Sequence, residues 1–392
     1  MTGAVTKITV IHRKAVVWLS STASRRCEDR SSDPLRDFVG LADRLVTRAR
    51  RVVALTGLGV LLLSSPVAAS RVGAAAAATT SAGHAQTREP FTTPYPLPAP
   101  AVQPQPCISL PPGPPAPPLP PPAVPEASIP IVTSPGPRHV SLAVFKGKGI
   151  WVTVFPGQPV KASSLVKTAR RAGLDALYVR TGSSHDGFYG GPLLEKLVPL
   201  AHRYGIAVIA WDFPTLSDPA ADAARAADAF RYGVAAFSPD IEEAPEGTYL
   251  TSRRVAYYYS LVRKDAGSSP VLATVPRPTS PSLGAYPYAA EAPFVDAFAP
   301  MVFWSCTEPG AAVALAVQVL RPLRPVVPIG EDYDMGSEGG PAGLPPGTQV
   351  WRFVDVAQRD GAIGVSLYDL ESGGPVQLAA LTDYPWPVIA AK

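Results

Sequence analysis

Two carboxylates stand two residues apart near the middle of the chain, directly after a short apolar run. Asp240 and Glu242 follow residues 233–237, which read Gly-Val-Ala-Ala-Phe. An apolar run of this kind predicts a buried parallel strand, and side chains two positions apart in an extended chain point to the same face. Two carboxylates directed from a strand end into one site are the groups that acid/base cleavage of a glycosidic bond requires. The alternative interpretation is a polar loop after a core strand.

These carboxylates lie within a repeating series of strands and helices that begins near residue 140. Strands are predicted over 149–155, 176–180, 206–212, 233–243, 271–275, 297–304, 326–330 and 364–369. Amphipathic helices are predicted over 160–172, 192–204, 218–232, 251–266, 310–321 and 348–360. Such alternation over about 250 residues is typical of an α/β fold of the (β/α)8 TIM barrel type. A doubly wound sheet is the alternative, but no glycine-rich phosphate turn follows the first strand, which favours a closed barrel.

The strand ends carry more acidic and aromatic side chains than a barrel needs for packing. Chemistry in this fold occurs at the carboxyl ends of the strands, where aromatic faces can stack on sugars and carboxylates can accept bonds from hydroxyls. We therefore assign Glu242 and Asp240 as candidate catalytic residues. The candidate substrate-binding residues are Asp186, Tyr189, Trp211, Asp212, Trp304, Glu331, Tyr368 and Asp369. For Trp211 the alternative is packing inside the barrel.

Sequence signatures of a metal or a cofactor are missing. The chain has five histidines, none in HxH or HExxH spacing, and no GxGxxG, P-loop or GxSxG motif. We expect no cofactor and assign no metal ligands. An all-oxygen magnesium or calcium site is left as an alternative without a loop signature.

The region before the barrel predicts export. Residues 1–47 are expected to be a disordered or mis-assigned extension, and 48–70 combine a basic stretch, an apolar run and small residues, as in a signal peptide or an N-terminal anchor. Residues 71–139, rich in Ala and Thr and then in Pro, are expected to form a disordered linker before the barrel at 140–392. The predicted location is secreted or attached to the cell envelope.

The basic charge of the chain belongs to its N-terminal part. Residues 1–75 carry 12 Lys and Arg against 5 Asp and Glu, whereas the remainder carries 23 against 26. No stripe of basic and aromatic residues occurs downstream, so we do not expect nucleic-acid binding. Of the three cysteines, Cys107 and Cys306 would remain after export, and an oxidising compartment permits them to pair. The alternative is that Cys306 is a free thiol near the barrel mouth.

Residues 145–392 resemble the secreted glycoside-hydrolase-like (β/α)8 barrels, on the stretches 186–211, 240–242 and 361–369. The Asp-x-Glu after the fourth strand is similar to the end of the motif in the chitinase-like family 18 and, more loosely, in the family 25 lysozymes. The resemblance implies that Glu242 is a general acid, its pKa raised by Asp240. Asp240 would orient it or assist the substrate. The chain departs from the motif at Ala235 and Ser238, where that family carries aspartates.

Taken together, these patterns predict a secreted, monomeric glycoside hydrolase that acts on an extracellular or cell-wall polysaccharide. The departures from the motif support an alternative, a degenerate barrel that binds glycans without cleaving them. A hydrolase with a carboxylate-bound metal is a third class.

Overall fold

Eight parallel strands form a nearly closed ring in the computed structural model, which describes residues 99–108, 117–136 and 138–386. The strands are β1 Gly147–Val152, β2 Ala176–Ser183, β4 Ala207–Phe213, β5 Ala236–Pro239, β6 Leu272–Pro276, β7 Ala297–Val302, β8 Ile329–Glu331 and β9 Gly364–Tyr368. They pair in the order β5-β4-β2-β1-β9-β8-β7-β6, and the two-residue strand β3, Gly187–Phe188, pairs antiparallel with β2. Between β5 and β6 the ring is joined by isolated bridges at Phe237–Val271 and Asp240–Thr274. The barrel prediction is thereby confirmed at the level of an eight-stranded parallel ring.

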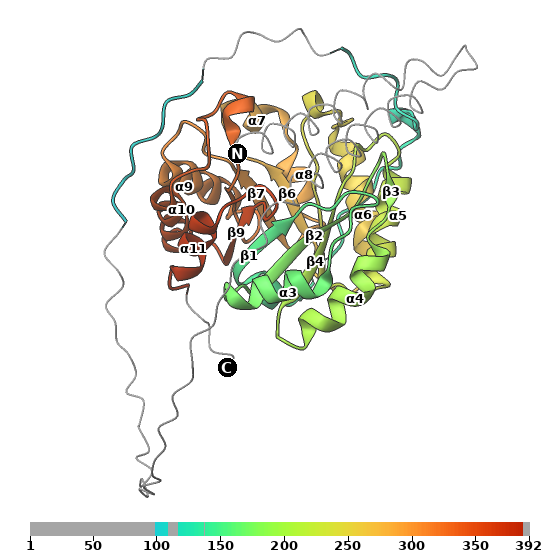
Figure 1. Cartoon of the computed structure of the whole chain (residues 1–392). Coiled ribbons are helices and arrows are strands. Elements are labelled where there is room, and N and C mark those ends of the chain that lie inside the picture. Colours follow the sequence, from blue (N-terminus) through green and yellow to red (C-terminus); the bar gives the residue numbers. More distant parts are fainter. Residues whose placement is uncertain (1–98, 109–116, 137, 387–392) are drawn as a thin grey trace, which may run out of the picture. The chain divides into compact units, whose positions relative to one another are not determined.

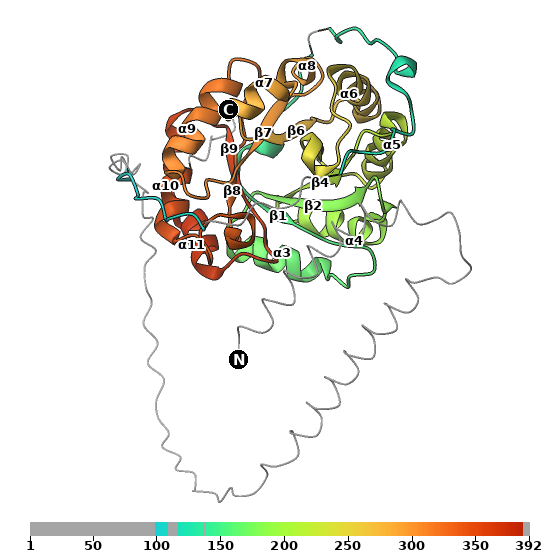
Figure 2. The ribbon, with the colours of Figure 1, turned by 90° about the horizontal axis from the view of Figure 1, so that it is seen from above.

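Helices surround this ring, as the view from above in Figure 2 shows. The helices are α3 Ala162–Arg171, α4 Gly191–His202, α5 Pro219–Phe230, α6 Ser252–Ala266, α7 Ser280–Ala285, α8 Tyr288–Glu291, α9 Pro309–Leu320, α10 Gly347–Arg359 and α11 Pro375–Asp383. Several begin at side-chain caps that accept bonds from free backbone N–H groups. Asp218 caps α5 by accepting from the N–H groups of Ala220 and Ala221, each at 3.1 Å, and Thr251 caps α6. The six predicted helices are confirmed, whereas the sequence analysis missed α7, α8 and α11.

Alternation along each strand divides the core into two layers. Residues of one parity point into the barrel, where Trp151, Tyr178 and Trp211 pack with smaller side chains. Residues of the other parity, such as Val179 and Phe237, pack against the surrounding helices. Because successive side chains of a strand point to opposite faces, parity decides whether a residue at a strand end reaches the mouth. We use "mouth" for the carboxyl-terminal end of the barrel.

An N-terminal strap, residues 99–108 and 117–136, runs around the outside of the barrel and is attached to it at a few points (Figure 1, cyan). Arg254, itself buried, holds the second stretch by an ion pair with Glu126 at 2.8 Å and by a hydrogen bond to the carbonyl of Val124. Ile129 inserts among buried residues. These two stretches lie within the linker predicted over 71–139, and the contacts above anchor them to the barrel. Proline-rich backbone has few hydrogen-bonding donors of its own, and here barrel side chains supply the anchoring.

The remaining N-terminal predictions lie outside the described residues. They are the extension at 1–47, the signal or anchor at 48–70 and the first part of the linker, through residue 98. Within the part of the chain that the structure describes, no helix is long and apolar enough to span a membrane.

Candidate active site

Asp240 and Glu242 lie at the carboxyl end of β5, on the parity that points into the barrel. Ser238, two residues before Asp240, bonds Thr274 of β6 through the two hydroxyls at 2.8 Å. The N–H of Asp240 donates to the carbonyl of Asp212 at 2.9 Å, which continues the pairing with β4 past the end of β5. Ile241, on the opposite parity, is fully buried in the outer layer. These contacts follow the predicted alternation as far as Ile241, and Glu242 is the next residue on the parity of Asp240.

Asp240 is a buried carboxyl with unused hydrogen-bonding capacity. It is 9% exposed, and its Oδ1 has no hydrogen-bond partner among the described residues. Burial raises the pKa of Asp240 to about 7; the Arg180 guanidinium opposes this rise and the charge of Asp212 adds to it. A buried polar atom without a partner is uncommon in a folded protein. Asp240 is thus placed to meet a group that arrives from outside.

Glu242 lies among other carboxylates at the mouth. Burial raises its pKa well above the ordinary value, and the charges of Asp240, Glu246, Glu243 and Glu338 raise it further. Glu338 belongs to a short helical turn after β8, and β8 is three strands away from β5 around the ring. The charge of Glu338 therefore reaches Glu242 from another part of the mouth. Such surroundings favour the protonated acid at neutral pH.

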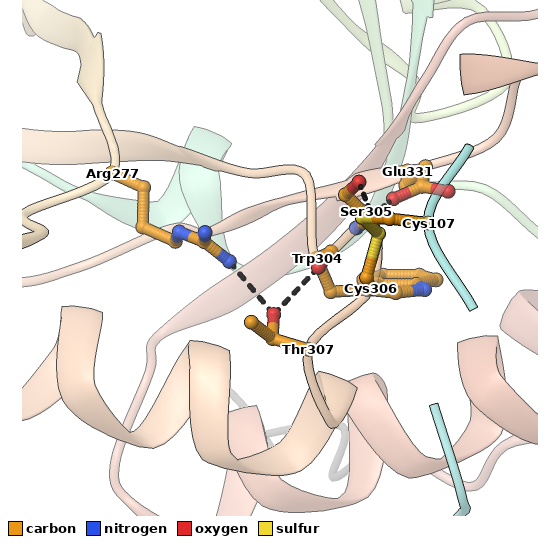
Figure 3. The surroundings of a disulfide bond; sticks show 7 residues. All are labelled: Cys107, Arg277, Trp304, Ser305, Cys306, Thr307 and Glu331. Carbon is orange, nitrogen blue, oxygen red and sulfur yellow. Dashed lines mark hydrogen bonds between the residues drawn. A yellow bond between two sulfur atoms is a disulfide. The ribbon is translucent and has the colours of Figure 1, made fainter. Parts of the chain in front are cut away.

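Glu331, the last residue of β8, supplies a third inward carboxyl. It is 3% exposed, and its Oε2 accepts a hydrogen bond from the N–H of Ser305 at 2.7 Å. Burial raises the pKa of Glu331 to about 7, while the bond from Ser305 opposes the rise. Arg277, which follows β6, points toward the same loop and donates from Nη1 to Thr307 Oγ1 at 3.1 Å (Figure 3).

The loop at 304–307 is tied to the strap by a disulfide between Cys107 and Cys306 (Figure 3). This confirms the pairing that the sequence permitted and excludes Cys306 as a free thiol. The loop also provides the N–H of Ser305 that holds Glu331. The disulfide therefore fastens the strap beside one wall of the site.

Aromatic rings line the interior next to these carboxyls. Trp211 packs edge to face on Trp151 at 5.4 Å between ring centroids and lies 6.4 Å from Tyr368. Tyr368, at the end of β9, is only partly buried and also contacts Phe303 and Tyr333, at 5.8 and 6.0 Å. Trp211 is 2% exposed, so its main role is packing inside the barrel, the alternative that the sequence analysis left open. Tyr368 remains available for contact at the mouth.

Asp186 and Tyr189 come from the turn and strand that follow β2. Asp186 accepts hydrogen bonds from Ser183 Oγ and His185 Nδ1, both at 2.8 Å. Burial opposes ionisation of Asp186, but these two bonds outweigh it, and its pKa is lowered. Tyr189 donates from its hydroxyl to the carbonyl of Val154 at 2.8 Å, and burial raises its pKa to about 12. Both residues stabilise the loop at one side of the mouth.

Three predicted substrate-binding residues point away from the mouth, which corrects their assignment. Asp212 is fully buried in an ion pair with Arg225 of α5, at 2.6 Å from Oδ2 to Nε. Trp304 is also fully buried; its Nε1 donates to Gln349 of α10 at 3.0 Å. Asp369 accepts from the N–H of Ser372 at 3.1 Å and so stabilises its own loop. Asp212 and Trp304 have the outward parity of their strands, and this explains why they face the helices.

The sequence analysis missed residues at the mouth that strand parity would have identified. Arg180 of β2 shares its parity with Tyr178, which points inward, and Phe303 shares its parity with inward-facing Ala299 and Met301 of β7. Tyr333 completes the aromatic group with Phe303, at 5.4 Å between ring centroids. Arg180 and Phe303 could have been found from the sequence, because each lies an even number of positions after a residue that points into the barrel.

Other features do not compete with this site for chemistry. Across residues 99–108, 117–136 and 138–386, no group of three or more His, Cys, Asp or Glu is arranged to hold a metal ion. A cavity of about 520 Å³ lies at the opposite end of the barrel, beside Val295, Asp296 and Arg324. These residues precede β7 and β8, so the cavity is remote from the carboxyls at the strand ends.

No known family's sequence model matches the chain, and no curated protein matches it either. Membership of family 18 or of the family 25 lysozymes therefore stays a prediction. Among solved structures, the spore cortex-lytic enzyme SleL of Bacillus cereus is similar at 13% identity and a TM-score of 0.46, over 60% of this chain and 73% of that one. A chitinase of Chromobacterium violaceum has 11% identity and a TM-score of 0.46, over 60% and 98%. A GH113 β-1,4-mannanase has 11% identity and a TM-score of 0.48, over 62% and 99%.

These similarities are distant, and the description of the fold rests on the strand order and the closing bridges of this chain. The candidate residues for chemistry are likewise taken from the geometry of this chain. They are Asp240, Glu242 and Glu331, with Arg180, Arg277 and Tyr368 around them.

Proposed function

We propose that this protein is a secreted glycoside hydrolase that cleaves an extracellular or cell-wall polysaccharide. The observation that carries the proposal is the placement of Asp240 and Glu242 on the inward parity at the end of β5, with the pKa of each carboxyl raised mainly by burial. Hydrolysis of a glycosidic bond needs one protonated carboxyl and one that can become negative, in the same site.

The roles follow from the surroundings of each carboxyl. Glu242 lies among four other carboxylates, which keep its proton in place until the leaving oxygen accepts it. Asp240 has the guanidinium of Arg180 as its opposing charge, which makes its ionised form easier to reach. In the proposed mechanism Glu242 protonates the glycosidic oxygen as its bond to the sugar breaks, and Asp240 stabilises the positive charge that develops on the sugar. Water then adds to the sugar carbon and gives its proton to Glu242, which restores the acid.

Two features support export. The predicted signal or anchor at 48–70 precedes the barrel, and the Cys107–Cys306 disulfide suits an oxidising compartment.

The test is Glu242→Gln, which keeps the size of the side chain but removes the transferable proton. The full chain and this variant are incubated with a panel of polysaccharides, and new reducing ends are counted. We expect kcat to fall by about 10²–10⁴-fold, the usual contribution of a general acid. The matched control is Glu195→Gln on the exposed face of α4, which makes the same chemical change away from the mouth.

An unchanged rate in Glu242→Gln would remove Glu242 from the mechanism. If the native chain releases no product from any polysaccharide and yet binds one, the function is the alternative one, glycan binding without cleavage.

A further inference from the structure

Arg180 occupies an unusual position inside the mouth. It lies on the inward parity of β2, and its guanidinium carbon is 5.0 Å from the ring centroid of Phe155 and 5.3 Å from that of Trp211. In the sheet, β2 stands between β1 and β4. Phe155 follows β1 and Trp211 belongs to β4, so the guanidinium has an aromatic ring on each side. Cation–π attraction of this kind holds a guanidinium in place.

The N–H groups of Arg180 are unused. No hydrogen bond or ion pair joins it to another of the described residues, and its Nε is buried without a partner. Two other arginine nitrogens, Arg253 Nε and Arg225 Nη2, are also buried without a partner. Three arginines that are more deeply buried than Arg180 nevertheless form ion pairs: Arg225 with Asp212, Arg254 with Glu126, and Arg263 with Asp296. In these three arginines an ion pair offsets part of the free-energy cost of burying the guanidinium. Arg180 has no ion pair that would offset the cost of burying its Nε.

Two of the three acidic residues near Arg180 are engaged elsewhere. Asp212 is paired with Arg225 at 2.6 Å, and Asp186 accepts from Ser183 and His185. Asp240 keeps its Oδ1 without a partner although it lies close enough to sense the charge of Arg180. The structure thus holds a guanidinium and a carboxyl in one interior, each with an unsatisfied buried atom.

We propose that Arg180, held between Phe155 and Trp211, binds the carboxylate of an acidic sugar, so that the substrate is a polysaccharide containing uronic acid. A guanidinium with rings on both sides presents its N–H edge, and this planar fork matches the two oxygens of a carboxylate. The uncharged sugar face would lie against Phe155, which is 37% exposed. The inference rests on the proposed function for its substrate but adds the chemical class of sugar.

The charge of the mouth allows an anionic sugar under mildly acidic conditions. The titratable groups that sense the charge of Arg180 are Asp186, Tyr189, Asp212 and Asp240. Burial raises the pKa of Asp240 to about 7, so Asp240 is mostly neutral at pH values below this. A uronic acid with an ordinary pKa of about 4 is still ionised there. Binding should therefore weaken as the pH rises through 7, when Asp240 becomes negative.

The experiment is calorimetric titration of the full chain with short oligomers of glucuronic, galacturonic and mannuronic acid. Each is compared with the same oligomer after chemical reduction of its carboxyl groups to alcohols. We expect at least one uronate oligomer to bind at least tenfold tighter than its reduced counterpart. Arg180→Gln should abolish that difference, so that the uronate oligomer and its reduced form bind this variant with equal affinity, and Arg180→Lys should restore only part of the difference.

The matched control is Arg170→Gln. Arg170 also has an aromatic neighbour, with its guanidinium carbon 3.9 Å from the Tyr204 ring centroid, but it lies on the exposed face of α3. The proposal is overturned if no uronate oligomer binds tighter than its reduced form, or if Arg180→Gln weakens both forms equally. Binding needs no cleavage, so an unchanged rate in Glu242→Gln leaves this test intact. If the native chain cleaves only neutral glycans, and Arg180→Gln cleaves them at the same rate, the uronate subsite is rejected and the proposed function stands.

Discussion

At the scale of single residues, the direction of each side chain separates the site from the scaffold. Asp240 and Asp212 are both acidic residues at strand ends and are joined by a backbone hydrogen bond. Asp240 points into the barrel, whereas Asp212 points outward and pairs with Arg225 through Oδ2; the Oδ1 atom of each aspartate is buried without a partner. One aspartate is available for a ligand, and the other has the role of a structural ion pair.

This difference predicts opposite behaviour of two conservative variants. Asp212→Asn should lower the free energy of unfolding by about 3 kcal/mol, because it leaves the buried Arg225 with less negative charge nearby. The folded fraction should keep its kcat, since the Asp240 N–H still bonds the backbone carbonyl of Asp212. The measurements are urea denaturation and activity per folded molecule. Glu242→Gln is the reciprocal control, which loses activity and keeps its stability. Loss of activity in Asp212→Asn at unchanged stability would contradict the assignment.

At the scale of elements, the strap converts a proline-rich segment into part of the folded unit. Its anchors come from α6, through Arg254, and from α10, where Arg352 donates to the carbonyl of Ala99 at 2.8 Å. The disulfide adds a covalent tie between Cys107 and the loop that positions Glu331. The strap thus connects the helical layer with one wall of the site.

Replacing both cysteines by serine should destabilise the protein. The disulfide closes a loop across a sequence separation of 199 residues, and a link of this kind restricts the unfolded chain by about 2–4 kcal/mol. We expect a lower denaturation midpoint for the double variant and faster proteolytic cleavage within 99–136. As the control, a reducing agent should lower the midpoint of the native chain but not that of the variant. Equal midpoints for the oxidised and reduced native chain would show that the disulfide contributes nothing.

At the scale of the whole molecule, burial of several carboxyls makes stability depend on pH. Burial raises the pKa of Asp240 and of Glu331 to about 7 and that of Asp332 to about 8. The folded state therefore binds these protons more tightly than the unfolded chain does. Their contribution to stability is complete below the unfolded values, near pH 4, and is lost as the pH rises through the folded values.

We accordingly expect the free energy of unfolding to fall between about pH 5 and pH 8. Urea titrations at several pH values across this range would measure the slope. Asp332 follows Glu331, but its carboxyl accepts from the N–H of Gly374 at 3.3 Å, outside the barrel mouth. Asp332→Asn should reduce the fall of the unfolding free energy near pH 8, and it should leave the side chains at the mouth unchanged. Stability that rises with pH over this interval would refute the expectation.

Much of the architecture was readable from local patterns. Buried parallel strands are short apolar runs, amphipathic helices have one apolar face, and their alternation specifies a barrel because each unit must bury two surfaces. The candidate pair Asp240 and Glu242 was also readable, since a spacing of two residues places both side chains on one face. These features depend on neighbours within a few residues along the chain.

Other features depend on residues that are far apart in sequence. Asp212 forms its outward ion pair because Arg225 lies beside it on α5. The pairing of β4 with β2, whose register shifts between Arg180 and Gly182, also contributes to this placement. Arg254, 128 positions after Glu126, turns part of a proline-rich stretch into a docked strap. Arg180 stands out only after two rings from different segments are seen beside it, and after Asp212 and Asp186 are seen to be bonded to other residues. The local sequence establishes which chemical groups reach each strand end, whereas their partners, and hence their unsatisfied bonds, arise from long-range packing.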